Sequence, residues 1–240
     1  MLFRSRSPDK RCGKSRVLDL LSLLAFNASP KTVKPTEASL FRSPSQNGGT
    51  LLLDEVEDLQ SADSDTAQAL GAVLNNGFEK NGTAQRMEKG ANGNFHLVNF
   101  ETFCPRVLAG INKTYDTLAD RSIPVLMQRK LRKEKLERFS PDNLTDEVQT
   151  LRDRCYTWVL THVKDLAAVY DTADKSFPAL DPLDDRAKDL WEPLVSVVSV
   201  AGGSTLLDEL TQLANDLSET RDGAGEDAVN LRVLDRKSVV

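Results

Sequence analysis

Hydrophobic and polar positions follow two different periods in the first half of the chain. Apolar residues recur every three to four positions over residues 17–24 and 67–74, which predicts amphipathic helices. Largely apolar runs occupy residues 50–53 and 107–111, and such runs are typical of strands buried inside a parallel sheet. A further strand is expected at residues 123–126. Strands that alternate with helices in this way predict an α/β core.

Weaker signals fill the connections between these elements. Residues 2–3 are the only apolar stretch before the first helix, so we expect either a first strand that is cut short or a sequence that lacks an upstream portion of the protein. A short strand is expected near Val33. Thr36 is a typical helix N-cap and predicts a short helix that ends at Arg42, with turn residues from 43 to 49.

Residues 83–88 and 95–100 have the alternating pattern of two strands, and they flank a turn rich in Gly and Asn. This pattern predicts a β-hairpin inserted into the core. Lys80, Arg86 and Lys89 predict a basic hairpin tip. Two interpretations stay open, a contact with nucleic acid and a solvated hairpin.

Helical periodicity dominates the second half of the chain. Three amphipathic patterns predict an all-α subdomain over residues 140–217, in which Asp184 or Asp185 caps a helix. Pro193 is expected to kink or restart that helix. The charged, glycine-containing sequence after residue 217 predicts a flexible tail over residues 218–240.

Composition restricts the class of protein without naming it. The chain of 240 residues is 40% hydrophobic and 28% charged, which is ordinary for a globular protein. A net charge of −5 argues against a wholly basic nucleic-acid-binding domain and leaves a local basic stripe open. No apolar run reaches the length of a membrane span, so we expect a cytoplasmic protein without a membrane partner. With 3 cysteines and 2 histidines, neither a zinc site nor a catalytic triad can be assembled.

Residues 7–15 contain a glycine, a lysine and a hydroxyl in the order that a phosphate-binding loop requires. Such a loop needs backbone N–H groups near a glycine, a lysine that reaches the terminal phosphates, and a hydroxyl that binds Mg²⁺. Gly13, Lys14 and Ser15 supply these groups directly before a predicted helix. Pro8 occupies the position of the first glycine in the general pattern and has no N–H to donate. We therefore predict that ATP binds at Gly13, Lys14 and Ser15.

Asp54 and Glu55 directly follow the apolar run at residues 50–53. In parallel sheets, ligands bind at the carboxyl ends of the strands. Asp54 could hold Mg²⁺ together with Ser15, and Glu55 could activate an attacking water. Acidic residues after an apolar strand also occur where they simply face solvent, and this interpretation stays open.

Two further polar residues follow or precede predicted strands. Asn112 comes after the run at residues 107–111 and could polarise a water near the terminal phosphate of ATP. Arg121 precedes the last predicted strand and could stabilise charge at the nucleotide of a neighbouring subunit. An ion pair of Arg121 with Asp116 or Asp120 is the alternative.

The glycine-lysine-serine loop, the Asp54-Glu55 pair, Asn112 and Arg121 stand in the order typical of an AAA+ type P-loop ATPase. The surrounding sequence more closely resembles one uncharacterised family, the domain of unknown function 3631, found in helicase-like and primase-associated proteins of phages, plasmids and bacteria. The resemblance covers about residues 5–205. Its most similar segments are residues 7–15, 50–55, 116–123, 129–130, 183–187, 191–194 and 201–203.

The motifs and the resemblance together imply a P-loop ATPase core over residues 1–130, followed by a helical lid. They imply Mg²⁺-dependent hydrolysis of ATP, a homo-oligomeric ring in which Arg121 completes a neighbour's site, and work on single- or double-stranded DNA. The sequence departs from the family before residue 7 and between residues 26 and 48. A second hypothesis therefore stays open, a non-catalytic protein that binds a nucleotide or associates with DNA.

Overall fold

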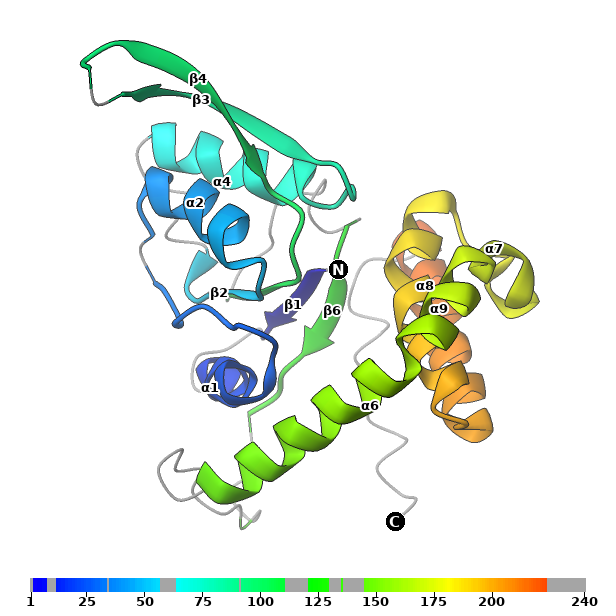
Figure 1. Cartoon of the computed structure of the whole chain (residues 1–240). Helices are drawn as coiled ribbons and strands as arrows, with labels where there is room; N and C mark the ends of the chain where they lie inside the picture. Colours follow the sequence, from blue (N-terminus) through cyan, green and yellow to red (C-terminus); the bar gives the residue numbers. More distant parts are fainter. Residues whose placement is uncertain are drawn as a thin grey trace. The chain divides into compact units, whose positions relative to one another are not determined.

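Two compact units make up the chain, residues 1–152 and residues 153–240. The computed structural model describes residues 2–7, 12–33, 35–56, 64–90, 92–110, 121–129, 135 and 145–223. Figure 1 shows a sheet with its covering helices in the first unit and a group of helices in the second. Among the described residues, no helix is both long enough and apolar enough to cross a membrane.

A four-stranded parallel sheet forms the centre of the first unit. Its strands are β1 (Leu2–Arg6), β2 (Leu51–Leu53), β5 (Arg106–Gly110) and β6 (Ile123–Leu126), in the spatial order β2-β5-β1-β6. Each neighbouring pair of these strands is parallel, so their carboxyl ends meet at one edge. The sheet confirms the prediction of an α/β fold built on parallel strands.

The first strand is longer than the hydrophobic pattern predicts. β1 has five residues and pairs with β5 on one side and β6 on the other. Arg4 and Ser5 are 6% and 1% exposed at its centre, although both are polar. The prediction of a two-residue strand is wrong because hydropathy alone does not assign polar residues to a buried strand.

Alternating side chains of the strands bury two separate clusters on the two faces of the sheet. On one face, Leu18 of α1 (Lys14–Leu24) packs with Leu52 and Val107. On the other, helices α2 (Glu37–Asn47) and α4 (Ser64–Asn76) pack with Leu53 and Leu108. The sheet is therefore covered by helices on both faces, which explains its largely apolar strands.

Helix α2 begins as predicted and ends later. The Thr36 hydroxyl caps it by accepting from the Ser39 backbone N–H at 3.2 Å. The helix then continues through Pro44 to Asn47 and stops at Gly48, which has a left-handed φ of +56°. The prediction of a turn over residues 43–49 is therefore wrong for residues 43–47, because Pro44 lies inside the helix and does not end it.

The end of α4 is fixed by a buried arginine. Arg106 Nη1 donates to the Leu74 carbonyl oxygen at 3.1 Å, and Nη2 donates to the Thr102 carbonyl oxygen at 2.8 Å. Burial lowers the pKa of Arg106 from its usual value, and Cys104 acts in the opposite direction. A Cβ added at Gly77 would overlap the guanidinium and the Thr102 oxygen, so glycine is required there by space.

The predicted hairpin is confirmed. Strands β3 (Thr83–Lys89) and β4 (Phe95–Glu101) pair antiparallel along their whole length. The expectation of a tip made basic by three cations needs correction. Lys80 precedes β3 at the opposite end of the hairpin from the turn, and Arg86 forms an ion pair with Glu37, N to O 3.0 Å.

The second unit is helical, as the periodicity predicts. Its elements are α6 (Thr145–Asp171), which begins before the unit boundary, α7 (Ala173–Ser176), a short 3₁₀ helix (Pro178–Leu180), α8 (Asp185–Val200) and α9 (Ser204–Gly223). Asp184 caps α8 by accepting from the Ala187 N–H at 2.7 Å. Helix α8 runs through Pro193 without restarting. Helix α9 extends six residues into the range expected to be a tail.

Candidate functional site

The amino end of α1 begins directly after a glycine in the left-handed backbone region. Gly13 has a φ of +88° and is the N-cap of α1, whose first residue is Lys14. A residue with a Cβ would be strained at this φ. The first turn of α1 contains no acidic residue, so nothing in it neutralises the partial positive charge of the helix end. The geometry suits an anion.

Lys14 is held at the carboxyl end of β1. Its Nζ donates a hydrogen bond to Ser7 Oγ at 2.5 Å, and Ser7 is 3% exposed just after the strand. The contact joins the two ends of the predicted phosphate-binding loop. Ser15 is exposed at the next helical position. Residues 8–11, which include Pro8, lie outside the described residues.

Asp54 is a buried carboxylate at the carboxyl end of β2, 6% exposed. Its backbone N–H donates to the Thr32 carbonyl oxygen at 2.9 Å, which fixes its position. One side-chain oxygen accepts from the Glu55 backbone N–H at 3.0 Å. A buried carboxylate needs such donors or a cation to offset its lost hydration, and Mg²⁺ is one cation that carboxylates bind.

Glu55 has an unusual backbone for a residue with a long side chain. Its φ is +53°, in the left-handed region, and its side chain is exposed. A non-glycine residue in this region costs of order 1 kcal/mol, and such strain concentrates at functional sites. The exposed side chain is compatible with both interpretations of Glu55, as a residue that activates water and as a carboxylate that faces solvent.

The register of the sheet brings the lysine and the acidic pair to the same edge. Leu53, Leu108 and Arg4 are level across β2, β5 and β1. Asp54 and Lys14 therefore both lie at the carboxyl edge, separated by the end of β5. Because neighbouring strands are about 4.8 Å apart, the ends of β1 and β2 are separated by roughly 10 Å.

Asn112 and Arg121 do not join this group in the described structure. Asn112 follows β5 and lies outside the described residues. Arg121 precedes β6, whose Ile123 is level with Phe3, so Arg121 is at the amino edge of the sheet. Its Nη1 is 3.4 Å from Asn75 Oδ1, at the end of α4. Arg121 and Lys14 are thus at opposite edges.

Three residues at the carboxyl edge were missed by the sequence analysis. Ser7 holds Lys14, and its place at the start of the loop was the only signal for it. Thr32 forms a single parallel bridge with Leu53, one residue from the short strand expected near Val33. Met127 follows β6, and its Cε would lie 3.6 Å from a Cβ on Gly13. Only the fold brings Met127 to the loop.

Metal ligands are sparse around these groups. Within the described part of the chain, no group of three or more His, Cys, Asp and Glu residues could hold a metal ion by itself. Mg²⁺ commonly binds through one or two protein ligands together with substrate phosphates. The Ser15 hydroxyl and the Asp54 carboxylate are the right chemical groups for such a shared site.

Residues 126–237 match the family described as "Protein of unknown function (DUF3631)". The match covers just under half of the chain and supports the resemblance to this family. It begins after Arg121, so it includes none of the site residues predicted from the sequence, and of the residues described above at the carboxyl edge it contains Met127. A comparison with curated proteins found no match.

Proposed function

We propose that the protein binds ATP with Mg²⁺ at the carboxyl edge of the sheet and hydrolyses it, as a helicase-like ATPase that works on DNA. The observation that carries this proposal is the placement of two opposite charges at that edge. Lys14 and the amino end of α1 stand on one side of β5, and Asp54 and Glu55 stand on the other. A triphosphate with a bound metal ion needs cationic groups that hold its phosphates and, on the other side, a carboxylate that holds the metal.

The topology of the sheet supports the same place. After β1 the chain passes through α1 to β2, which lies on one side of β1. The strand that follows β5 is β6, which lies on the other side of β1. The connections after β1 and β5 thus leave in opposite directions. In open α/β sheets, ligands bind outside the carboxyl ends of strands where the connections diverge in this way.

Each residue has a role in the proposed site. Backbone N–H groups that begin at Gly13 and the Lys14 ammonium hold the phosphates. The Ser15 hydroxyl and the Asp54 carboxylate would hold Mg²⁺, which would neutralise charge on the phosphates. Glu55 takes a proton from the attacking water. We assign to the Asn112 amide the polarisation of that water.

Replacement of Lys14 tests the proposal. The change Lys14→Ala is expected to weaken ATP binding roughly 10- to 100-fold, because a hydrogen bond to a charged group contributes about 1.5–3 kcal/mol. Binding is measured by titration with a fluorescent ATP analogue and Mg²⁺, and hydrolysis by phosphate release with and without single-stranded DNA. Lys80→Ala, at an exposed turn lysine, is the matched control.

The binding titration and the phosphate-release assay together separate the two hypotheses that the sequence left open. Wild-type protein that binds ATP and releases no phosphate is a non-catalytic nucleotide-binding protein. Wild-type protein that does not bind ATP, or a Lys14→Ala variant that binds as well as wild type, would overturn the proposed site.

Arg121 is proposed to act on the nucleotide of a neighbouring copy. Its place at the amino edge excludes contact with a nucleotide held by Lys14 of the same chain. A ring of copies in head-to-tail contact can bring the two edges together. Hydrolysis by Arg121→Ala and by Lys14→Ala is therefore expected to be slow for each variant alone.

Mixing the two variants distinguishes an arginine acting in a neighbour from a structural one. In an equal mixture, about a quarter of the interfaces join an intact phosphate loop to an intact Arg121, so hydrolysis should recover to roughly that fraction. The measurement is phosphate release across a series of mixing ratios. Activity that never exceeds the average of the two variants means that Arg121 has a structural role and does not act on a neighbour's nucleotide.

A further inference from the structure

The hairpin exposes large apolar side chains on the face opposite Arg86 and Glu88, the two hairpin residues that form ion pairs with α2. This outer face consists of Met87, Lys89, Phe95 and Leu97, in the cross-strand pairs Met87 with Leu97 and Lys89 with Phe95. Met87, Phe95 and Leu97 are 59%, 65% and 56% exposed. Cross-strand pairs that stay more than half exposed gain less for folding than buried pairs, because much of their apolar surface remains in water. The stability of the hairpin therefore does not explain why large apolar side chains are exposed on this outer face.

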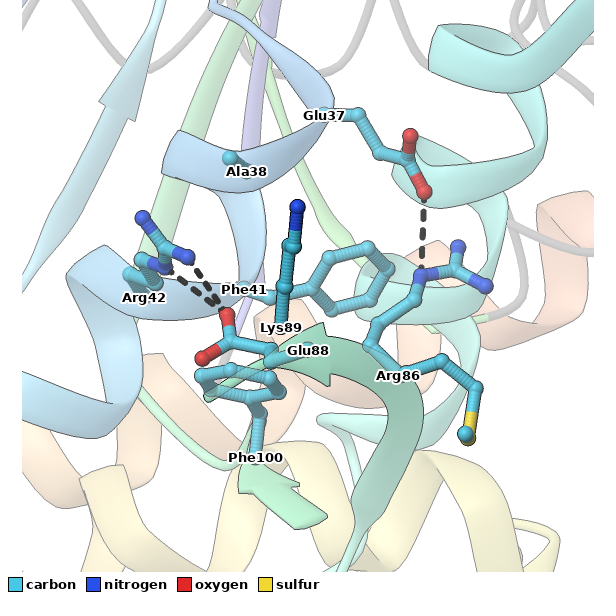
Figure 2. A pocket seen from close by; sticks show the side chains of 9 residues that line it. Glu37, Ala38, Phe41, Arg42, Arg86, Glu88, Lys89 and Phe100 are labelled. Carbon is cyan, nitrogen blue, oxygen red and sulfur yellow. Dashed lines mark hydrogen bonds and ion pairs between the residues drawn. The ribbon is translucent and has the colours of Figure 1, made fainter. Parts of the chain in front are cut away.

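Ion pairs with carboxylates involve two of the cations beside the cavity of the hairpin, Arg86 and Arg42. Arg86 pairs with Glu37, and its Cζ lies 4.3 Å from the centre of the Phe41 ring. Arg42 pairs with Glu88, Nη2 to Oε1 2.5 Å. Among the residues that the structure describes, no carboxylate pairs with Lys89. Figure 2 shows both ion pairs at the cavity that Lys89 also lines.

That cavity carries a positive surplus beside the outer face. It has a volume of about 360 Å³, and α2 and the hairpin form its walls. Three cations, Arg42, Arg86 and Lys89, line it with two carboxylates. The two carboxylates already pair with Arg42 and Arg86, so a polyanion that follows the hairpin would meet a local net charge of +1. This charge favours the binding of a phosphate.

The dimensions of the outer face argue against a protein partner. Two strands of seven residues span roughly 20 Å by 10 Å, or about 200 Å². A stable protein interface buries about 800 Å² on each partner. A single strand of nucleic acid needs less area, because each base can stack on one aromatic ring while the backbone follows separate cations.

We propose that the outer face of the hairpin binds single-stranded nucleic acid, with a base stacked on Phe95 and a phosphate at Lys89. Met87 and Leu97 provide the apolar surface beside the stacked base. The inference deepens the proposed function, because it rests on an ATPase that works on DNA and names the part of the chain that contacts the strand. The hairpin is separate from the carboxyl edge that holds ATP in that proposal.

Fluorescence anisotropy of a labelled oligodeoxythymidine tests the inference. Phe95→Ala is expected to weaken binding roughly 5- to 100-fold, in line with one lost stacking contact. Lys89→Gln is expected to lower the slope of log affinity against log salt by about 0.7, the value for one phosphate of a single strand. Phe103→Ala, at an aromatic residue that is 45% exposed outside the hairpin, is the control and should bind as wild type.

The outcomes separate this inference from the proposed function. ATP binding, measured in the same preparations, should be unchanged by Phe95→Ala, so a failure to bind ATP bears only on the proposed site. Equal oligonucleotide binding by wild type and Phe95→Ala would overturn the inference. Wild-type protein that ignores the oligonucleotide but self-associates, and loses self-association in Phe95→Ala, would show that the face holds a second copy instead.

Discussion

Glu55→Gln is expected to lower phosphate release by roughly 10²- to 10⁴-fold while ATP binding stays close to that of wild type. The amide keeps the size and hydrogen-bonding reach of the side chain but cannot accept a proton from water at neutral pH. Because the proposed role of Glu55 begins only after ATP is bound, the loss should fall on kcat. The measurement is phosphate release under single-turnover conditions beside the fluorescence titration.

Glu79→Gln is the control for this change. Glu79 is an exposed turn residue of the same unit, away from the carboxyl edge, so its amide should release phosphate at the wild-type rate. Release by Glu55→Gln within a few-fold of wild type would remove Glu55 from the catalytic group of the proposed site.

A second change at position 55 separates the backbone from the carboxylate. Glycine accepts a φ of +53° without strain, so Glu55→Gly should keep or raise the free energy of unfolding, by up to about 1 kcal/mol. Hydrolysis should still be lost. A Glu55→Gly variant that is more stable and inactive would show that the strained glutamate lowers stability in exchange for activity.

Gly77→Ala is expected to destabilise the first unit by about 3 kcal/mol or more. The added methyl group would overlap the Arg106 guanidinium and the Thr102 carbonyl oxygen. Neither can move freely, because the guanidinium is buried and bonded to carbonyl oxygens of both Leu74 and Thr102. Displacing it would leave buried carbonyl groups without donors, which adds to the cost of overpacking. Urea unfolding followed by circular dichroism measures the loss.

Gly71→Ala is the matched control within the same helix. A Cβ at Gly71 would meet nothing within 4 Å, so alanine there should stabilise α4 by about 0.5–1 kcal/mol. Trp158 and Trp191 both belong to residues 153–240, so their fluorescence follows the second unit and should change little in either variant. Equal stability of Gly77→Ala and wild type would show that Arg106 does not constrain the end of α4.

The carboxyl edge and the hairpin explain different parts of the proposed activity. Lys14, Asp54 and Glu55 could bind and hydrolyse ATP without any contact to a nucleic acid. The outer face of the hairpin could bind a strand without ATP. Coupling between them would pass through β4 and β5, since only residues 102–105 separate the hairpin from the strand that lies between Lys14 and Asp54.

Period and turn chemistry were sufficient to place most elements from the sequence. The apolar runs predicted β2, β5 and β6, and the alternating pattern predicted the hairpin. Thr36 was identified as a cap, and of the two candidates Asp184 and Asp185 the structure shows Asp184 as the cap of α8. These features are local, because a hydrophobic period and a cap depend on residues a few positions apart. At the end of α4, space around Arg106 and not a left-handed φ requires glycine at position 77.

Several features depended on residues far apart in the chain. Arg4 and Ser5 are strand residues only because β5 and β6 enclose them, and α2 passes Pro44 where the local signal predicts a turn. The sequence predicted Arg86 as part of a basic hairpin tip, whereas in the structure it forms an ion pair with Glu37 of α2. For Arg4, Ser5 and Arg86, a contact with residues far away in the chain outweighed a local preference.

For the candidate site, the sequence determined which chemical groups are present, and the tertiary structure decided which of them meet. Gly13, Lys14, Asp54 and Glu55 could be named from their neighbours in the chain. That Lys14 and Asp54 share one edge while Arg121 lies at the other follows from the strand order β2-β5-β1-β6 and its parallel register. Strand order is set by packing between segments distant in sequence, so no local pattern contains it.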